Sequence, residues 1–425
     1  MKILLLTRFV PYPPDSGPKI KTYHLLRHLA AHHEVTLVTF VRNLQDEDCA
    51  AQLHDLCAAI HTVPLRRSAW SNFGAMACSC LSGRPFIIER ETVSAMHGLV
   101  EKLVFTAAAA GVPFDLVHTD QLQMAQYAER LPLLRLLDIH SIVSATFDRL
   151  ASQKPLLTRL FYRREVALLR RYEAAICTEF EAITVVSEKD RQALLGLLAE
   201  PRELAVIPIG IDTEAVPIAQ RELASRTVLS LTSMVMPSNL DGVLWFARAI
   251  YPLVRRAVPE AQLLVCGPFH DPEIAALDRH DATIEVTGYL ADLQPVIMRA
   301  ACIIVPQRSG SGLSVKLLEA LARGIPVVST TLGYEGIDLL PGHHLLVADT
   351  PSDFADAVSL LLREPELGLR LGEAGRQRVL ERYDWRAVCP AIEKVYGHML
   401  AQNRLPADGR AAYTEFTPET QQARS

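Results

Sequence analysis

Short apolar runs alternate with helix-length amphipathic stretches along most of the chain, and the alternation starts anew near residue 227. Apolar strands that alternate with helices are typical of a parallel sheet covered by helices on both faces. In the first half the expected strands are Lys2–Phe9, Val35–Val41, Ile60–Leu65, Phe114–His118, Leu134–Ile139, Ala182–Val186 and Ala205–Ile209. In the second half they are Thr227–Leu231, Ala261–Cys266, Ile284–Thr287, Cys302–Pro306 and Pro326–Thr330. The sequence therefore predicts two Rossmann-like α/β domains in series.

A polar stretch without periodicity, residues 210–226, separates the two patterns. We expect a first domain over residues 1–212, a second over 213–384, and a final helix over 385–400 with Asp384 as its N-cap. The polar residues 401–425 are expected to form a disordered tail. Because sheets of this kind bind ligands at the carboxyl ends of their strands, the active site is expected in the cleft between the two domains.

Charge and cysteine content exclude several classes of protein. The chain has 43 Lys and Arg against 48 Asp and Glu, a net charge of −5, so nucleic acid is not an expected partner. Eight cysteines are too sparse for a disulfide scaffold, and the pair Cys78-x-Cys80 lacks the spacing of a zinc site. Arg8 interrupts the first apolar run, and no window reaches about 18 apolar residues. We therefore expect a cytoplasmic protein that does not span a membrane.

The segment V-P-Q-R-S-G-S-G-L-S-V-K-L-L-E-A, residues 305–320, carries the strongest chemical signal. A buried strand ends at Pro306, a loop of small residues follows, and a helix is expected from about Leu313. Glycines let main-chain N–H groups approach a ligand, and a helix N-terminus favours phosphate. Lys316 and Glu319 lie opposite the apolar face of this helix, as a solvated surface pair or as part of an anion site. The glycine-rich loop favours the anion site.

This segment, followed by G-I-P-V-V-S-T at residues 324–330, resembles the donor-binding region of retaining glycosyltransferases of family 4, which have the GT-B fold. The resemblance extends from Y-P-P-D-S-G at residues 12–17 to Y-D-W at 383–385. The chain is most similar to the bacterial branch associated with exopolysaccharide systems, which also shares an M-x-x-x-x-N-x-D segment, here residues 234–241. This implies two Rossmann-like domains in the GT-B arrangement, with a C-terminal helix that returns to the N-terminal domain.

The resemblance assigns most donor contacts to the second domain. Glu319 matches the second glutamate of the family's E-x7-E motif, which accepts hydrogen bonds from the donor ribose. Arg308 and Lys316 would neutralise the diphosphate and act in catalysis. The remaining donor-binding candidates are three glycines, a leucine and an asparagine that is either a donor contact or a helix N-cap: Gly17, Gly310, Gly312, Leu313 and Asn239.

Three serines depart from the family pattern. Ser311 stands where the first glutamate of E-x7-E is expected, and Ser233 and Ser238 align with the usual Arg and Lys of the donor clamp. Either Arg308 and Lys316 neutralise a larger share of the donor's negative charge, or the donor binds weakly or not at all.

Strand ends in the first domain supply candidates for the acceptor side. His118 lies close to the position of a functional histidine in many family members and is a candidate catalytic residue, while Asp120 takes what resembles a second histidine position. Asp138 and His140 lie at the end of the next strand. Each is either a structural hydrogen-bonding residue or a group that acts on the acceptor.

A run of arginines on one helical arc marks a basic amphipathic helix: Arg159, Arg163, Arg164, Arg170 and Arg171. Such a helix either rests on anionic lipid or packs on the core with a solvated basic face. A weaker candidate for lipid contact is the segment 66–73, R-R-S-A-W-S-N-F.

The expected activity is transfer of a hexose, with retention, from a nucleotide diphosphate sugar to an acceptor hydroxyl, without a metal ion or other cofactor. The expected acceptor is a glycan or polyprenyl-linked intermediate of exopolysaccharide or cell-surface polysaccharide synthesis, with a possible peripheral contact at the inner face of the plasma membrane. Two alternatives stay open: a nucleotide-sugar epimerase on the same fold, and a non-catalytic nucleotide-sugar binding or scaffold protein. The sequence does not determine the sugar, the base, the linkage or the oligomeric state.

Overall fold

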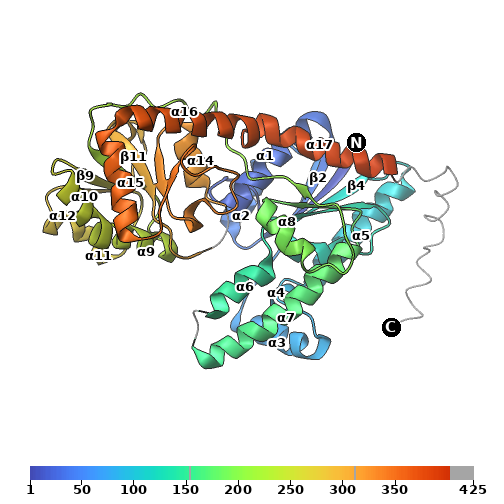
Figure 1. Cartoon of the computed structure of the whole chain (residues 1–425). Coiled ribbons are helices and arrows are strands. Elements are labelled where there is room, and N and C mark those ends of the chain that lie inside the picture. The colour runs from blue at the N-terminus through green and yellow to red at the C-terminus, as the bar shows by residue number, and fades with distance from the viewer. Residues whose placement is uncertain (153–154, 311–312, 403–425) are drawn as a thin grey trace. The chain divides into compact units, whose positions relative to one another are not determined.

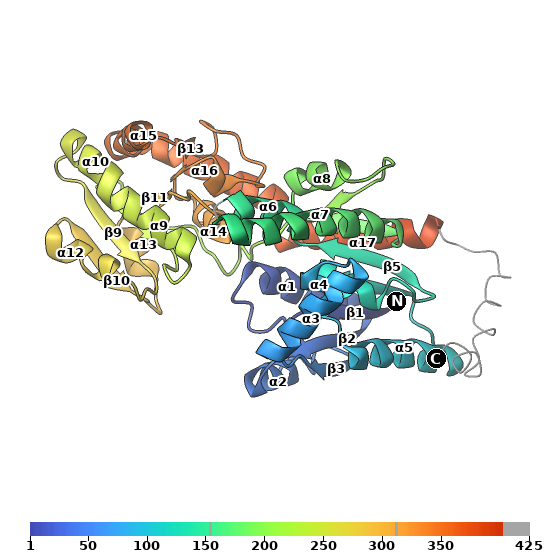
Figure 2. The same cartoon turned by 90° about the horizontal axis from the view of Figure 1, so that it is seen from below.

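Two parallel sheets organise the chain (Figures 1 and 2). The computed structural model describes residues 1–152, 155–310 and 313–402. In this part of the chain one sheet has seven strands and the other has six, and all named strand pairs are parallel. The chain divides into an N-terminal unit, residues 1–208 together with those from 389 onward, and a C-terminal unit, residues 209–388.

The sheet of the N-terminal unit has the strand order β3-β2-β1-β4-β5-β6-β7. Its strands are β1 (Lys2–Thr7), β2 (Glu34–Val41), β3 (Ala59–Pro64), β4 (Leu116–Asp120), β5 (Leu134–Ile139), β6 (Ala182–Val185) and β7 (Ala205–Val206). Its helices are α1 (Gly17–His32), α2 (Leu44–Ala51), α3 (Ala69–Ser82), α4 (Phe86–Glu89), α5 (Ser94–Ala109), η1 (Leu122–Tyr127), α6 (Val143–Ser152), α7 (Leu156–Thr178) and α8 (Glu188–Leu195). The register places Asp120 of β4 directly beside Asp138 of β5.

The sheet of the C-terminal unit has the strand order β10-β9-β8-β11-β12-β13. Its strands are β8 (Thr227–Leu231), β9 (Gln262–Cys266), β10 (Ile284–Gly288), β11 (Ala300–Val305), β12 (Val327–Ser329) and β13 (Leu346–Val347). Its helices are α9 (Pro237–Trp245), η2 (Phe246–Ile250), α10 (Tyr251–Ala257), α11 (Pro272–Ala275), α12 (Leu277–His280), α13 (Gln294–Met298), α14 (Val315–Ala322), η3 (Leu332–Tyr334), α15 (Pro351–Arg363) and α16 (Pro365–Arg382).

Helices bury both faces of the C-terminal sheet. Successive residues of a strand point to opposite faces, and Leu264 and Val265 of β9 accordingly belong to two different hydrophobic clusters. One cluster includes Phe354 of α15, and the other includes Leu317 of α14. Burial on both faces explains why most residues of β9 and β11 are apolar.

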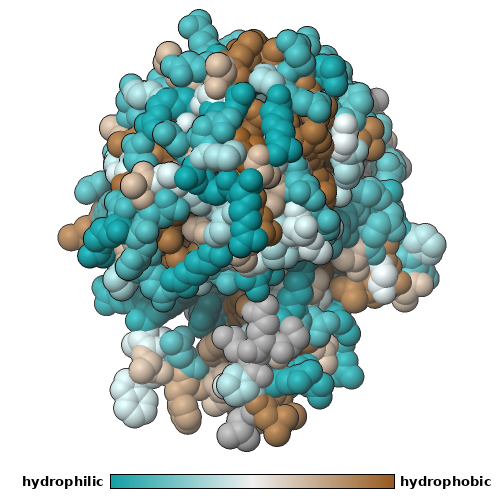
Figure 3. All heavy atoms as spheres, turned by 60° about the vertical axis from the view of Figure 1, so that its left-hand side comes forward, coloured by the Kyte–Doolittle hydropathy of each residue, from teal (hydrophilic) through white to brown (hydrophobic). Residues whose placement is uncertain are grey.

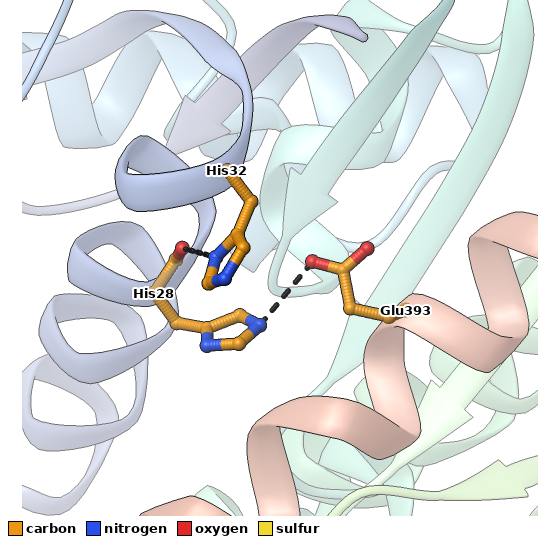
Figure 4. Close-up of side chains that lie close together, drawn as sticks. All are labelled: His28, His32 and Glu393. Atoms are coloured by element: carbon orange, nitrogen blue, oxygen red, sulfur yellow. Dashed lines mark hydrogen bonds and ion pairs between the residues drawn. The ribbon is translucent and has the colours of Figure 1, made fainter.

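The last helix, α17 (Trp385–Gln402), starts in the C-terminal unit and continues in the N-terminal unit. Asp384 accepts a hydrogen bond from the main-chain N–H of Arg386 at 2.7 Å, as expected for an N-cap. Further along α17, the carboxylate of Glu393 lies 3.3 Å from His28 Nε2 of α1 (Figure 4). It also lies 3.0 Å from Nε2 of His33, the residue that follows α1. The final helix therefore returns to the N-terminal unit, as predicted.

The strand positions follow the sequence-based expectation, with β13 as an addition that was not predicted. The expected tail lies outside the described residues from residue 403 on. Among the helices described, none is both long and apolar enough to cross a bilayer.

Candidate functional site

The carboxyl edge of the C-terminal sheet joins the ends of two strands to the starts of two helices. Lys316, near the start of α14, donates hydrogen bonds to Asn239 Oδ1 at 2.8 Å and to Thr232 Oγ1, just after β8, at 3.2 Å. Asn239 lies in the first turn of α9 and donates from Nδ2 to the carbonyl oxygen of Ser233 at 2.8 Å. The N-cap of α9 is Met236, so Asn239 is a side-chain contact of Lys316 rather than a helix cap.

Burial shifts the pKa of both ionisable groups on α14. It lowers the pKa of Lys316 to about 8, because an ammonium ion loses hydration in this environment. It also raises the pKa of Glu319, an effect that the nearby Arg323 partly offsets. Lys316 and Glu319 are therefore not the solvated surface pair of the alternative interpretation.

The N-terminus of α14 is open to an anion. Ser314, the residue before the helix, makes no side-chain cap, and its buried hydroxyl has no hydrogen-bond partner within the described part of the chain. Buried polar groups are normally paired, so an unpartnered hydroxyl at a helix start indicates a missing ligand or water. A helix N-terminus favours phosphate through its free N–H groups and its dipole.

The loop after β11 packs closely around this edge. Gly310 has φ of +105°, and a Cβ there would lie 3.0 Å from Gln307 Nε2 and 3.5 Å from Ser238 Oγ. Arg308 lies over the ring of Trp245 at 5.2 Å, and its guanidinium is 3.8 Å from Asp241 Oδ1. Leu313 is half-buried. Two further positions, Ser311 and Gly312, lie outside the described residues.

A second cluster of charges is buried in the N-terminal unit, at the carboxyl ends of β4 and β5. Asp138 Oδ1 is 2.7 Å from Lys21 Nζ and accepts a hydrogen bond from the Thr184 hydroxyl at 2.6 Å. His140 Nε2 lies 2.9 Å from Asp120 Oδ1 and 3.3 Å from Asp138 Oδ2. His118 and Tyr396 also belong to the cluster, with His118 Nδ1 2.6 Å from the Tyr396 hydroxyl of α17.

Opposite charges set the protonation states of this buried cluster. Burial by itself would raise the pKa of Asp138, but Lys21 and His140 hold it well below its usual value. Burial would likewise lower the pKa of His140, but Asp120 and Asp138 raise it to about 9. At neutral pH Asp138 is therefore ionised and His140 is protonated.

The structure adds residues that the sequence analysis did not name. Lys21, Thr184 and Tyr396 bind the predicted acceptor-side residues directly. Gln121, next to Asp120, has a backbone φ of +75°, and its buried side-chain nitrogen has no partner among the residues described. Such strain is commonly retained at functional sites.

The predicted site residues thus fall into two groups, one in each unit. Lys316 and Asn239 are in contact, and the 308–310 loop lies beside α9. Asp120, Asp138, His118 and His140 form the buried cluster of the N-terminal unit. Gly17 is the first residue of α1, whose N-cap Ser16 makes no side-chain cap.

Two protein-family models match the chain. The model described as "Glycosyl transferase 4-like domain" matches residues 16–210, and the one described as "Glycosyl transferases group 1" matches residues 225–364. Together they span most of both units.

Two curated relatives match over most of their own length. An uncharacterized 44.6 kDa protein in the cps region of Klebsiella pneumoniae is 20% identical, over 83% of this chain and 89% of its own. The MMP α-(1→4)-mannosyltransferase of Mycolicibacterium hassiacum is 26% identical, over 72% of this chain and 77% of its own.

Solved structures share the two-sheet fold. Sucrose-phosphate synthase from Thermosynechococcus elongatus superposes with a TM-score of 0.64 at 18% identity, covering 95% of this chain and 100% of its own. HepE from Anabaena, solved in complex with UDP-glucose, gives a TM-score of 0.60 at 13% identity, covering 94% of this chain and 100% of its own. The predicted GT-B fold, with two Rossmann-like domains, is confirmed.

Proposed function

The chain belongs to the group 1 glycosyltransferases of the family 4 type, the retaining family predicted from its motifs, and we propose that it transfers a hexose from a nucleotide diphosphate sugar to a glycan or polyprenyl-linked acceptor. The observation that carries the donor assignment is the uncapped start of α14 beside the Lys316–Asn239 contact. A phosphate there would meet the main-chain N–H groups of the helix start, the unpartnered Ser314 hydroxyl and the half-buried ammonium group of Lys316.

In this proposal the chemistry depends on stabilising the leaving diphosphate. Negative charge grows on the phosphate as the glycosidic bond breaks, and fixed cations and N–H groups stabilise that charge without reorganisation. Retention without a placed nucleophile implies a front-face route, in which the departing phosphate oxygen assists the incoming hydroxyl. Glu319 would hold the donor ribose. The members of the buried cluster at β4 and β5, with His118 as the candidate catalytic residue, would organise the acceptor side.

Glu319→Ala is expected to weaken donor binding by about 1.5–3 kcal/mol, the value of a hydrogen bond to a charged group. The dissociation constant should therefore rise roughly 10- to 150-fold. A thermal-shift screen of UDP-, GDP- and ADP-sugars on the wild-type chain identifies the donor, because a bound ligand raises the melting temperature by mass action. Titration of the variant with that donor then measures the loss.

Glu273→Ala serves as the matched control, because it also removes a glutamate from the C-terminal unit. The Glu273 side chain is 52% exposed and forms an ion pair with Arg248. It should leave donor affinity unchanged. Equal affinity of Glu319→Ala and the wild type would refute the ribose assignment. If none of the sugar nucleotides raises the melting temperature of the wild type, the result favours the scaffold alternative. Conversion of the donor in the absence of an acceptor would favour the epimerase.

The proposed acceptor pathway is assembly of an exopolysaccharide or another cell-surface polysaccharide. The similarity to a protein of a cps region supports this pathway. A polyprenyl-linked acceptor resides in the membrane, so we extend the proposal to a peripheral contact at the cytoplasmic face of the plasma membrane.

An exposed apolar surface on α3 supports the membrane contact. Trp70, Phe73 and Leu81 are 84%, 71% and 90% exposed, and their spacing places them on one face of the helix. At the start of α7, Leu156 and Leu160 are 75% and 59% exposed. These elements form the lowest part of Figure 1, and the corresponding part of Figure 3 shows brown, apolar side chains at the surface. Large apolar side chains on a common face indicate a binding surface.

The arginines of α7 divide between internal contacts and the surface. Arg164 donates to the Ser79 carbonyl oxygen of α3 at 2.8 Å, and Arg170 pairs with Asp148 at 3.0 Å. Only some of the arginines on the predicted basic face of α7 are therefore available to contact lipid. Arg163 and Arg171 are exposed on the same helix as the two leucines, as expected for contact with anionic head groups.

Replacement of both Trp70 and Phe73 by Ser is expected to weaken binding to phosphatidylglycerol vesicles at least tenfold in a co-sedimentation assay. Each apolar side chain that leaves water contributes about 1.5–3 kcal/mol when fully buried, so losing two exceeds this threshold. Binding should also fall as salt screens the arginines. Leu44→Ser, at a position 78% exposed on α2, is the control and should bind as the wild type does. Undiminished binding of the double variant would exclude α3 as the contact.

A further inference from the structure

Two helices far apart in the sequence bring histidines and a carboxylate together in the N-terminal unit. His28 and His32 lie one turn apart on α1, and Glu393 faces them from α17 (Figure 4). One potential ligand atom of each residue lies within 4.8 Å of those of the other two. Residues four apart on a helix project side by side, so α1 presents the two imidazoles as a pair.

The hydrogen bonds determine which ring nitrogens can coordinate a metal. His32 Nδ1 lies 2.8 Å from the main-chain oxygen of His28. Because a carbonyl oxygen only accepts, Nδ1 carries the proton and Nε2 keeps its lone pair. Metal-binding histidines commonly have this second hydrogen bond. His28 Nε2 is shielded from solvent, 3.3 Å from Glu393 Oε1, and lacks a hydrogen bond of good geometry within the described residues.

His33 and an adjacent pocket support the same arrangement. His33 Nε2 lies 3.0 Å from both oxygens of Glu393, so it can fix the orientation of the carboxylate. His32 and His33 also line an open pocket of about 730 Å³ that gives an ion access from solvent.

We propose that His28, His32 and Glu393 bind a divalent transition metal ion of the zinc class and that this ion clips α17 to α1. Two imidazoles and a carboxylate form a ligand set that zinc uses, with water in the fourth position. Zinc bonds of about 2.1 Å hold ligand atoms about 3.4 Å apart, so these atoms, which lie within 4.8 Å of one another, have to approach further when the ion binds. The expectation against zinc concerned only the spacing of the cysteines, and this site contains no cysteine.

Isothermal titration of the metal-free full-length chain with Zn²⁺ tests the site. The expected result is one ion per chain, with a dissociation constant in the micromolar range. His32→Ala and Glu393→Gln should each weaken binding at least about tenfold. His398→Ala removes an exposed histidine of α17 itself and should bind Zn²⁺ as the wild type does. His32 is exposed, so its variant should keep the wild-type melting temperature without metal and lose only the increase that Zn²⁺ produces.

Co²⁺ absorption separates this site from the cysteines, of which Cys78 and Cys80 are exposed. Cobalt bound to thiolate gives an intense near-ultraviolet charge-transfer band, whereas a histidine–carboxylate site gives visible bands without it. The proposal predicts the second spectrum in the wild type and its loss in His32→Ala. Absence of binding to the wild type, a thiolate spectrum, or undiminished binding by His32→Ala would overturn it.

Discussion

Asp138→Asn is expected to reduce the free energy of unfolding of the N-terminal unit by about 3–5 kcal/mol. The carboxylate is fully buried, 2.7 Å from the ammonium group of Lys21 and in hydrogen-bond contact with Thr184. An amide cannot neutralise that ammonium ion, which is itself without solvent exposure. The variant therefore leaves an uncompensated charge in the core. Urea unfolding followed by circular dichroism measures the loss.

A double variant and an exposed pair control this prediction. Lys21→Met combined with Asp138→Asn should recover at least half of the loss, because a buried ion pair replaced on both sides is often nearly neutral. Asp15→Asn removes the 58% exposed partner of Lys19 and should change stability by less than about 0.5 kcal/mol. A double variant no more stable than Asp138→Asn would contradict the ion-pair explanation.

The strands could be predicted because burial on both faces leaves a local signal. β5 and β8 have the bounds expected from the sequence, since most residues of each strand are leucine, isoleucine or valine. β13 could not be predicted, because a strand of only two residues has no periodicity and exists through its pairing with β12. The length of β7 likewise depends on pairing rather than on a local pattern. It is shorter than expected, because only Ala205 and Val206 pair with β6.

Site residues that belong to one contiguous motif could be predicted from the sequence. Their contacts with residues far away along the chain could not. The loop and helix of residues 305–320 pointed to Lys316, but its contacts lie 77 and 84 positions away in the sequence. Tyr396 is 278 positions from His118, and no local pattern connects them.

Lys21 left a signal that could have been used. It occupies the buried face of α1 with Leu25 and Leu29, at the spacing of an apolar stripe. A lysine in such a stripe requires a buried partner of opposite charge, because an unpaired ammonium ion is rarely buried. The sequence thus indicates that an acidic partner exists, whereas only the tertiary structure identifies it as Asp138.

Lys316→Ala is expected to lower turnover at least tenfold, which corresponds to about 1.4 kcal/mol of barrier. This expectation rests on the proposed donor site, where the Lys316 ammonium lies near the uncapped start of α14. The loss should persist at saturating donor, because the charge that Lys316 stabilises grows as the bond breaks. Arg248→Ala, which removes a 57% exposed cation from the same unit, should leave turnover unchanged. Steady-state kinetics with the donor from the thermal-shift screen measures both.

A rescue experiment connects Lys316 with the serines that depart from the family pattern. Ser233 accepts a hydrogen bond from Asn239, the partner of Lys316, and Ser238 lies beside Gly310 in the loop after β11. Ser233→Arg combined with Ser238→Lys would return cations to this edge of the sheet, so the pair should restore part of the turnover lost in Lys316→Ala. In the wild-type background the same pair should change turnover little, because Lys316 already supplies the charge. If Lys316→Ala turns over an identified donor at the wild-type rate, the diphosphate is neutralised elsewhere and this clamp is wrong.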